Sequence, residues 1–209
     1  LTLPPGEVRR PARFFSAEEA RRIIGLAGER ERIVYLTALM TGMRAGELMG
    51  LQREDLDFQR RLIFIRRSVW QGQAQTPKSE CSARPVPMPE ALAGLLAKHL
   101  QERAVPAQGW VFAGRNGQPM NARKLVEKRL RPLLDALGIA RCGLHAFRHT
   151  HASLLVDGGA AASVVRDQMR HIDVRTTLGV YAHAAVNAQR GAVEGVRARC
   201  PGRRFRSGP

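Results

Sequence analysis

A short β-rich stretch inside an otherwise helical sequence limits the folds that this chain can adopt. Residues 60–70 read RRLIFIRRSVW, a run rich in β-branched and aromatic side chains that predicts a strand. Residues 71–83 are polar and turn-rich, and RPVPM at 84–88 predicts a short returning strand. The two prolines of that segment confine it to a sheet edge, because proline cannot donate to a β-ladder. The stretch predicts a small antiparallel sheet with Lys78 in its loop.

Helical signals occupy most of the remaining sequence. Ser16 followed by Glu19 has the spacing of a capping box and predicts a helix N-terminus. A nearly continuous apolar run predicts a buried helix over 31–41, which Gly42 interrupts before a short helix over RAGELMGL. Further helices are predicted over residues 89–103, 121–137, 145–157, 160–169, 174–180 and 187–199. The chain is therefore expected to be mostly α with a small antiparallel β-sheet, an α+β fold.

The charge of the chain favours nucleic acid as its partner. Among 209 residues, 34 Lys and Arg outnumber 18 Asp and Glu, which gives a net charge of +16. Arginine predominates among the basic residues, and its guanidinium binds phosphate oxygens in pairs. A solvated basic surface with no ligand is the competing interpretation. An anionic membrane fits less well, because the basic residues are spread along the sequence and no apolar run approaches the roughly 20 residues of a membrane span.

Cysteine usage and the first residues favour an intracellular setting. The three cysteines are widely spaced and odd in number, so no disulfide framework is expected. The first ten residues, LTLPPGEVRR, lack the apolar region of a signal peptide.

The segment GLHAFRHTHAS at 143–153 raises the question of a metal site. His145 and His149 are four residues apart on one helical face, and Cys142 would be a third ligand, a workable arrangement for zinc. However, the zinc-protease pattern requires Glu directly after the first histidine, and Ala146 stands there. The sequence has no second cluster of ligating residues, so no metal is expected. His149 is interpreted as structural, and no role is assigned to His151.

Two further segments carry chemistry only in combination. Arg44 stands after Gly42 at the start of a short helix, where free backbone N–H groups also favour an anion. Glu47 would hold Arg44 through an i, i+3 pair, although such pairs are also common on solvated surfaces. Tyr181 lies near a predicted helix end from which its phenol would reach outward, although packing is the commoner role of a lone tyrosine. Tyr35 lies in the apolar helix and is predicted to be a core residue.

The order and spacing of these residues resemble the catalytic domain of the tyrosine recombinases, the phage integrase family. That family has an arginine in a T-G-x-R-x-x-E-L segment, a lysine on a β-hairpin, an H-x-x-R helix, a further histidine and then a nucleophilic tyrosine. The resemblance covers residues 14–190. One departure is that MR precedes the last histidine where the family usually has Leu-Gly, which would alter the turn or add a phosphate contact. The matching residues are Arg44, Lys78, His145, Arg148, His171 and Tyr181.

The resemblance implies a site-specific DNA recombinase that uses no metal, cofactor or ATP. Tyr181 would attack the scissile phosphodiester to give a 3′-phosphotyrosyl link, and the 5′-hydroxyl of a partner strand would then rejoin the DNA. The other implied roles are phosphate clamps for Arg44 and Arg148, general base for His145, general acid for Lys78, a phosphate hydrogen bond for His171, and orientation of Arg44 or the base for Glu47.

Two alternatives share part of this chemistry. A type IB topoisomerase-like enzyme would relax DNA without exchanging partners, but histidine at both 145 and 171 favours a recombinase. A non-catalytic DNA-binding accessory protein would have kept the fold without the full set of catalytic residues. The presence of a matching residue at all six catalytic positions argues against this alternative.

The resemblance also implies partners, location and domain organisation. The partners are double-stranded DNA and further protomers in a tetrameric synapse, with a monomer allowed for an isolated domain off DNA. The expected location is the bacterial or phage cytoplasm, associated with the nucleoid. Family members usually carry an N-terminal core-binding domain, so this chain is either an excised catalytic domain, which is the favoured expectation, or an unusually minimal protein. The predicted division is a linker or arm remnant at 1–13, the catalytic domain at 14–199 and a flexible basic tail at 200–209.

Overall fold

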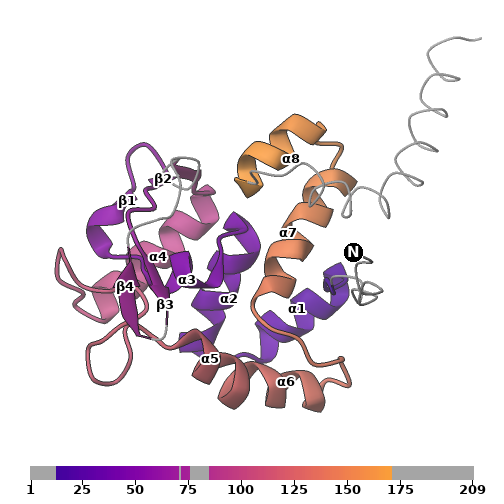
Figure 1. Cartoon of the computed structure of the whole chain (residues 1–209), viewed down its shortest axis with the longest axis horizontal. Coiled ribbons are helices and arrows are strands. Elements are labelled where there is room, and N and C mark those ends of the chain that lie inside the picture. Colours follow the sequence, from indigo (N-terminus) through magenta and orange to yellow (C-terminus); the bar gives the residue numbers. More distant parts are fainter. Residues whose placement is uncertain (1–12, 71, 76–84, 171–209) are drawn as a thin grey trace, which may run out of the picture. The chain divides into compact units, whose positions relative to one another are not determined.

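The computed structural model of this chain describes residues 13–70, 72–75 and 85–170. This part of the chain is mainly helical, as Figure 1 shows. A π-helical turn, Val126–Leu130, joins two of the helices into one continuous segment. The helices are α1 (Ala17–Leu26), α2 (Glu29–Thr41), α3 (Ala45–Met49), α4 (Glu90–Glu102), α5 (Ala122–Leu125), α6 (Arg131–Ala136), α7 (His145–Asp157) and α8 (Ala162–Met169).

The strands of the described residues form two small antiparallel sheets. The first sheet has the order β1-β2-β5, from β1 (Leu56–Asp57), β2 (Leu62–Ile63) and β5 (Val86–Pro87). The second sheet pairs β3 (Ser68–Trp70) with β4 (Gln73–Gln75). In register, Ile63 lies opposite both Leu56 and Val86, and Val69 lies opposite Ala74. The expected fold class is confirmed, and β5 lies at a sheet edge as its prolines require.

The prediction of a single strand over 60–70 is wrong in detail. The run divides into β2 and β3, which belong to different sheets. Between β2 and β3, the side chains of Arg66 and Arg67 form ion pairs with Glu54 and Asp55. The backbone passes from the first sheet to the second at this point. The polar, turn-rich composition of residues 71–83 predicts a loop there, whereas residues 73–75 form strand β4. Every residue of β4 is exposed, so it lacks the alternation of apolar and polar residues that marks a half-buried strand.

The predicted helix ends correspond to real caps. The Ser16 hydroxyl accepts a hydrogen bond from the Glu19 N–H at 3.0 Å, and the Glu19 carboxylate accepts one from the Ser16 N–H at 2.9 Å. Helix α2 ends at Gly42, whose φ of 64° lies in the left-handed region that glycine adopts without strain. The boundaries of α7 match the predicted range of 145–157.

The described residues divide into two compact units, with the boundary between His151 and Ala152. The first unit has a large apolar core that includes Tyr35, which is buried as predicted, together with Phe112 and Phe147. The described residues of the second unit pack around Val156 and Val165. The boundary lies inside α7, so this helix begins in one unit and ends in the other. Within the described residues, no helix has the length and apolar character needed to cross a membrane.

Candidate active site

Arg44 stands at the N-terminus of α3, directly after the turn that ends α2. Its backbone is extended, and its N–H donates to the Glu47 carboxylate at 2.9 Å. Its guanidinium donates to the other oxygen of the same carboxylate, also at 2.9 Å. Glu47 is buried, whereas the Arg44 side chain is 36% exposed. The predicted pair is therefore present, and it holds a partly accessible guanidinium by both its backbone and its side chain.

Helix α3 lies directly against strand β3, and Gly46 makes this approach possible. A Cβ at this position would collide with the Ser68 hydroxyl and lie 3.1 Å from the Val69 carbonyl oxygen. A side chain there would require the Ser68 hydroxyl to turn away and the strand backbone to move slightly. The glycine of RAGEL therefore sets the distance between the helix that carries Arg44 and the β3–β4 hairpin.

Arg148 links α7 to the same turn. The residue is 4% exposed, and its guanidinium donates a hydrogen bond to the Gly42 carbonyl. Gly42 precedes Arg44 by two residues, so this bond brings together two arginines that are far apart in the sequence. The donor and acceptor are 106 residues apart, which no local sequence pattern encodes.

His145 is the first residue of α7 and lies within electrostatic range of both arginines. Its side chain is exposed, yet neighbouring protein atoms desolvate the ring and lower the pKa of His145. The positive charges of Arg148 and Arg44 lower this pKa further, while Glu47 opposes them. The imidazole is therefore neutral at neutral pH and able to accept a proton.

The opposite side of α7 is fastened to the core. The Phe147 ring stacks on Tyr35 with 5.1 Å between centroids, and it meets Phe15 edge to face at 4.9 Å. The buried Thr150 hydroxyl accepts a hydrogen bond from the Phe15 N–H at 2.8 Å and donates to the Ala146 carbonyl at 2.8 Å. These contacts hold the residues on either side of Arg148.

His151 forms a further contact between α7 and a distant segment, in this case α2. Its Nδ1 lies 2.8 Å from the Leu39 carbonyl oxygen, so Nδ1 carries the proton in this contact. No role is predicted from the sequence for His151 or Thr150. Their spacing from Phe147, i+3 and i+4, places all three on one helical face, and that pattern was a usable signal.

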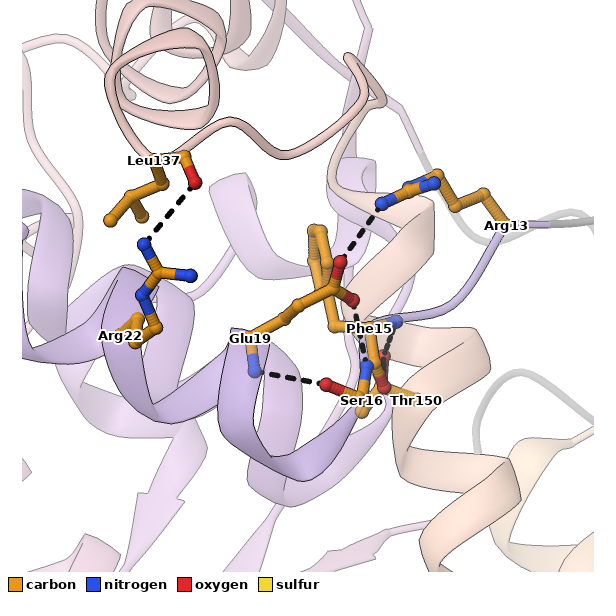
Figure 2. Close-up of polar contacts among 7 residues, drawn as sticks. All are labelled: Arg13, Phe15, Ser16, Glu19, Arg22, Leu137 and Thr150. Carbon is orange, nitrogen blue, oxygen red and sulfur yellow. Dashed lines mark hydrogen bonds and ion pairs between the residues drawn. The ribbon is translucent and has the colours of Figure 1, made fainter.

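The segment before α1 is held by a set of polar contacts, which Figure 2 shows together with the bond to Thr150. Arg13 donates to Glu19 at 3.1 Å, and the same carboxylate accepts from the Ser16 N–H. Arg22 donates to the Leu137 carbonyl at 3.2 Å, past the end of α6. The first helix is thus fixed against both α6 and the helix that carries Arg148.

Four of the seven predicted site residues lie together, and three lie outside the described residues. Arg44, Glu47, His145 and Arg148 are joined by the contacts and electrostatic effects given above. The residues outside the described ranges are Lys78, His171 and Tyr181.

The alternative of a zinc site gains no support. Within residues 13–70, 72–75 and 85–170, no three His, Cys, Asp or Glu side chains are grouped as a metal ion would require. Burial raises the pKa of the Cys142 thiol, which disfavours the thiolate that zinc needs. Burial also lowers the pKa of His149, as do the nearby His145 and Arg148.

Arg170 occupies the position where the family pattern usually has glycine. Its φ is 48°, in the left-handed region, and its N–H donates to backbone carbonyls at the end of α8. The left-handed turn is thus present despite the arginine, so this residue type does not prevent it. The alternative expectation, a phosphate contact by this side chain, stays a prediction.

Comparisons with known sequences agree on one family. The model of the family described as "Phage integrase family" matches residues 13–188. A protein described as "Tyrosine recombinase XerC-like" from Caldanaerobacter subterraneus subsp. tengcongensis is 29% identical over 217 aligned positions, which cover 91% of this chain and 55% of that protein. The "ICEBs1 integrase" of Bacillus subtilis is 27% identical, covering 87% of this chain and 53% of its own length. The chain spans about half the length of the curated relatives it matches.

Solved structures show the same fold at low sequence identity. The Tn1549 transposon integrase in complex with transposon right end DNA superposes with a TM-score of 0.78 and 22% identity, covering 90% of this chain and 67% of that one. The crystal structure of XerA recombinase gives a TM-score of 0.68 at 22% identity, covering 96% of this chain and 68% of that one.

Proposed function

The chain belongs to the phage integrase family, and on that premise we propose that it is the catalytic domain of a site-specific tyrosine recombinase. Double-stranded DNA is its substrate, and the reaction cleaves and rejoins strands through a covalent protein–DNA link. The net charge of +16 supports a polyanionic substrate.

The hydrogen bond from Arg148 to the Gly42 carbonyl is the observation that carries this proposal. It places a second guanidinium beside the turn that leads to Arg44, and the pKa of His145 responds to both charges. Two guanidinium groups beside a neutral imidazole suit a phosphodiester, because the cations bind its oxygens and the imidazole accepts a proton. The competing interpretation, a solvated basic surface with no ligand, gives no reason for the burial of Arg148.

The cleavage step uses Tyr181 as nucleophile. The phenol oxygen forms a bond to phosphorus, the P–O5′ bond breaks, and a 3′-phosphotyrosyl link and a free 5′-hydroxyl result. A free phenol has a pKa of about 10, so His145 takes its proton as attack proceeds. Lys78 gives a proton to the leaving 5′ oxygen. The link conserves the energy of the broken bond, so the scheme uses neither a metal nor a nucleotide.

Arg44 and Arg148 stabilise the charge that grows on the pentacovalent phosphorus. One well-placed donor of this kind contributes about 3 kcal/mol, roughly a hundredfold in rate. His171 donates to a phosphate oxygen, and Glu47 keeps Arg44 oriented through the contacts already described.

The biological unit extends beyond this chain. Strand exchange takes place in a synapse of four protomers on DNA, and we place it in the bacterial or phage cytoplasm, associated with the nucleoid. We propose residues 14–199 as the catalytic domain.

The test is formation of a covalent adduct on nicked DNA that carries a candidate attachment site, with EDTA present. The wild-type protein should form an adduct that survives denaturation, and Tyr181→Phe should not. Tyr35→Phe is the matched control, because Tyr35 is the other tyrosine of the chain and is buried in the core.

An adduct that persists in Tyr181→Phe, or cleavage by the wild type that requires zinc and leaves no adduct, would contradict the proposal. Relaxation of supercoiled plasmid without strand exchange would identify a topoisomerase-like enzyme instead.

A further inference from the structure

The buried carboxylate of Asp55 contacts both the residues that follow α3 and the residues that precede β3. Its side chain is only 1% exposed, and the proposed function assigns it no role. We infer that Asp55 is a positioning residue for the cleavage reaction: it fixes the β3–β4 hairpin, which leads to the proposed general acid Lys78, relative to the helix that carries Arg44. This inference rests on the proposed function.

One oxygen of the Asp55 carboxylate joins two segments of the chain. Its Oδ2 accepts a hydrogen bond from the Gln52 N–H at 2.8 Å and another from the Arg67 guanidinium at 2.9 Å. Gln52 stands three residues after the last residue of α3, and Arg67 directly precedes β3. A hydrogen bond between arginine and a carboxylate is charge-assisted and stronger than a neutral one. The carboxylate therefore holds the start of the hairpin to the end of α3.

The other carboxylate oxygen shows that this arrangement is costly. Oδ1 is buried and has no hydrogen-bond partner among the described residues, although the Arg66 guanidinium lies 3.6 Å from it. An incompletely satisfied charge in the protein interior opposes folding, so the stability of the core alone gives no reason to keep it. The contacts of Asp55 with Arg66 and Arg67, at the passage between the two sheets, supply such a reason.

Two glycines of α3 and its C-terminus bring the same segment close. A Cβ at Gly50 would lie 2.8 Å from the Arg67 carbonyl oxygen, and Gly46 allows the approach of β3 described above. Helix α3 thus packs directly against β3 (Figure 1). The glycines permit this approach but supply no side chain to hold it. The directional contact that fixes the strand along the helix is the hydrogen bond between Arg67 and Asp55.

The hairpin connects this contact with the proposed chemistry. Strand β3 pairs with β4, which ends at Gln75, three residues before Lys78; Lys78 itself lies outside the described residues. A small rotation at the start of a hairpin moves its far end by a larger distance. A displacement of about 1 Å can lower a rate on the order of a hundredfold, and a general acid must lie within hydrogen-bond distance of the leaving oxygen.

Loss of the Asp55 contact should therefore affect one part of the reaction selectively. Proton transfer from Lys78 to the leaving 5′ oxygen depends on the position of the hairpin. Phosphate binding by Arg44 depends on α3, where the Glu47 carboxylate holds both its N–H and its guanidinium. The first should be impaired in a variant of Asp55, and the second should be retained.

The test compares cleavage of two nicked DNA substrates, one of ordinary DNA and one with sulfur in place of the bridging 5′ oxygen. With sulfur, the tyrosine oxygen forms its bond to phosphorus, the P–S bond breaks and the sulfur leaves as a thiolate. A thiol has a pKa of about 8.5, so this group leaves without a proton from a general acid. Asp55→Asn should slow cleavage of the oxygen substrate roughly tenfold or more and leave cleavage of the sulfur substrate close to the wild-type rate.

Asp57→Asn is the matched control. The Asp57 carboxylate lies on β1 of the same sheet and accepts from the Arg60 N–H at 2.8 Å, in the turn before β2. Its removal should change the rates on the two substrates by the same factor. Arg67→Gln breaks the contact from its less buried side, at a side chain that is 19% exposed, and should reproduce the selective loss. The double variant D55N/R67Q should lose no more than either single variant, because both remove one interaction.

An equal loss on the two substrates in Asp55→Asn and Arg67→Gln would overturn the inference, because it would indicate a role in stability alone. Wild-type rates on the oxygen substrate in both variants would overturn it as well. The wild-type protein separates this inference from the proposed function. Adducts with both substrates together with equal losses remove only the role of Asp55, whereas no adduct with either substrate removes the proposed function.

Discussion

At the residue scale, Arg148 is an unusual side chain because it is a cation in the protein interior. Arginine is almost never fully buried unless its charge is paired or its donors are satisfied. Here the Gly42 carbonyl accepts one of its hydrogen bonds. A preorganised charge in a desolvated site acts more strongly than one in water, since little solvent must reorganise as the reaction proceeds. The same charge lowers the pKa of His145, so the phosphate-binding role proposed for Arg148 and the general-base role proposed for His145 depend on each other.

Tyr35 provides a prediction at this scale. Its hydroxyl is buried and has no hydrogen-bond partner among the described residues, and burial raises the pKa of the phenol far above its usual range. Removing an unsatisfied hydroxyl relieves its desolvation, so Tyr35→Phe should raise the free energy of unfolding by roughly 1 kcal/mol or leave it unchanged. Urea denaturation measures this.

The control for that prediction is Tyr35→Leu, which loses the ring stacked on Phe147. It should lower the free energy of unfolding by roughly 1 to 3 kcal/mol. A loss of more than about 1 kcal/mol in Tyr35→Phe would mean that the hydroxyl has a partner in the folded protein.

At the element scale, α7 has two faces with different tasks. His145 and Arg148 lie three residues apart and face the turn before α3. Phe147, Thr150 and His151 face the core and bond to segments distant in the sequence. The position of the first pair therefore depends on how firmly the second set is held.

Thr150→Val tests that dependence. Valine has nearly the shape of threonine but cannot accept the Phe15 N–H, so this buried donor loses its partner and the free energy of unfolding should fall by about 1 to 3 kcal/mol. Hydrogen exchange should show faster exchange at the Phe15 amide. Thr150→Ser keeps the hydroxyl and should retain slow exchange there. Equal protection of this amide in the two variants would contradict the importance of the hydrogen bond.

At the scale of the whole molecule, histidines set the dependence of stability on pH. Burial lowers the pKa of His99, His145, His149 and His151 from the ordinary value of 6.5. Just below pH 6.5 the unfolded chain therefore binds more protons than the folded protein does. The free energy of unfolding should be largest above pH 6.5 and should fall as the pH decreases through that value, as measured by urea denaturation at successive pH values.

The carboxyl of Asp55 has the opposite effect on the free energy of unfolding at lower pH. Burial raises the pKa of Asp55, so its protonation favours the folded protein as the pH falls through the carboxyl range. The histidine effect should therefore be clearest between about pH 7 and 5.5. Replacing His151 by Gln should flatten the profile in that interval. A free energy of unfolding that rises as the pH falls from 7 to 5.5 would contradict the assignment.

The sequence by itself determined what depends on neighbours along the chain. The capping box at Ser16, the left-handed turn at Gly42, the limits of α7 and the pairing of Arg44 with Glu47 all follow from spacings of a few residues. These features form wherever the local segment folds, so local rules predict them.

Only the tertiary structure decided the contacts between distant segments. The division of 60–70 between two sheets and the bond from Arg148 to Gly42 depend on which surfaces meet when the core forms. His151 received no role from the sequence because its partner, Leu39, lies 112 residues away. The free energy that selects such pairs comes from burying apolar surface across the whole first unit, and no short window of sequence contains it.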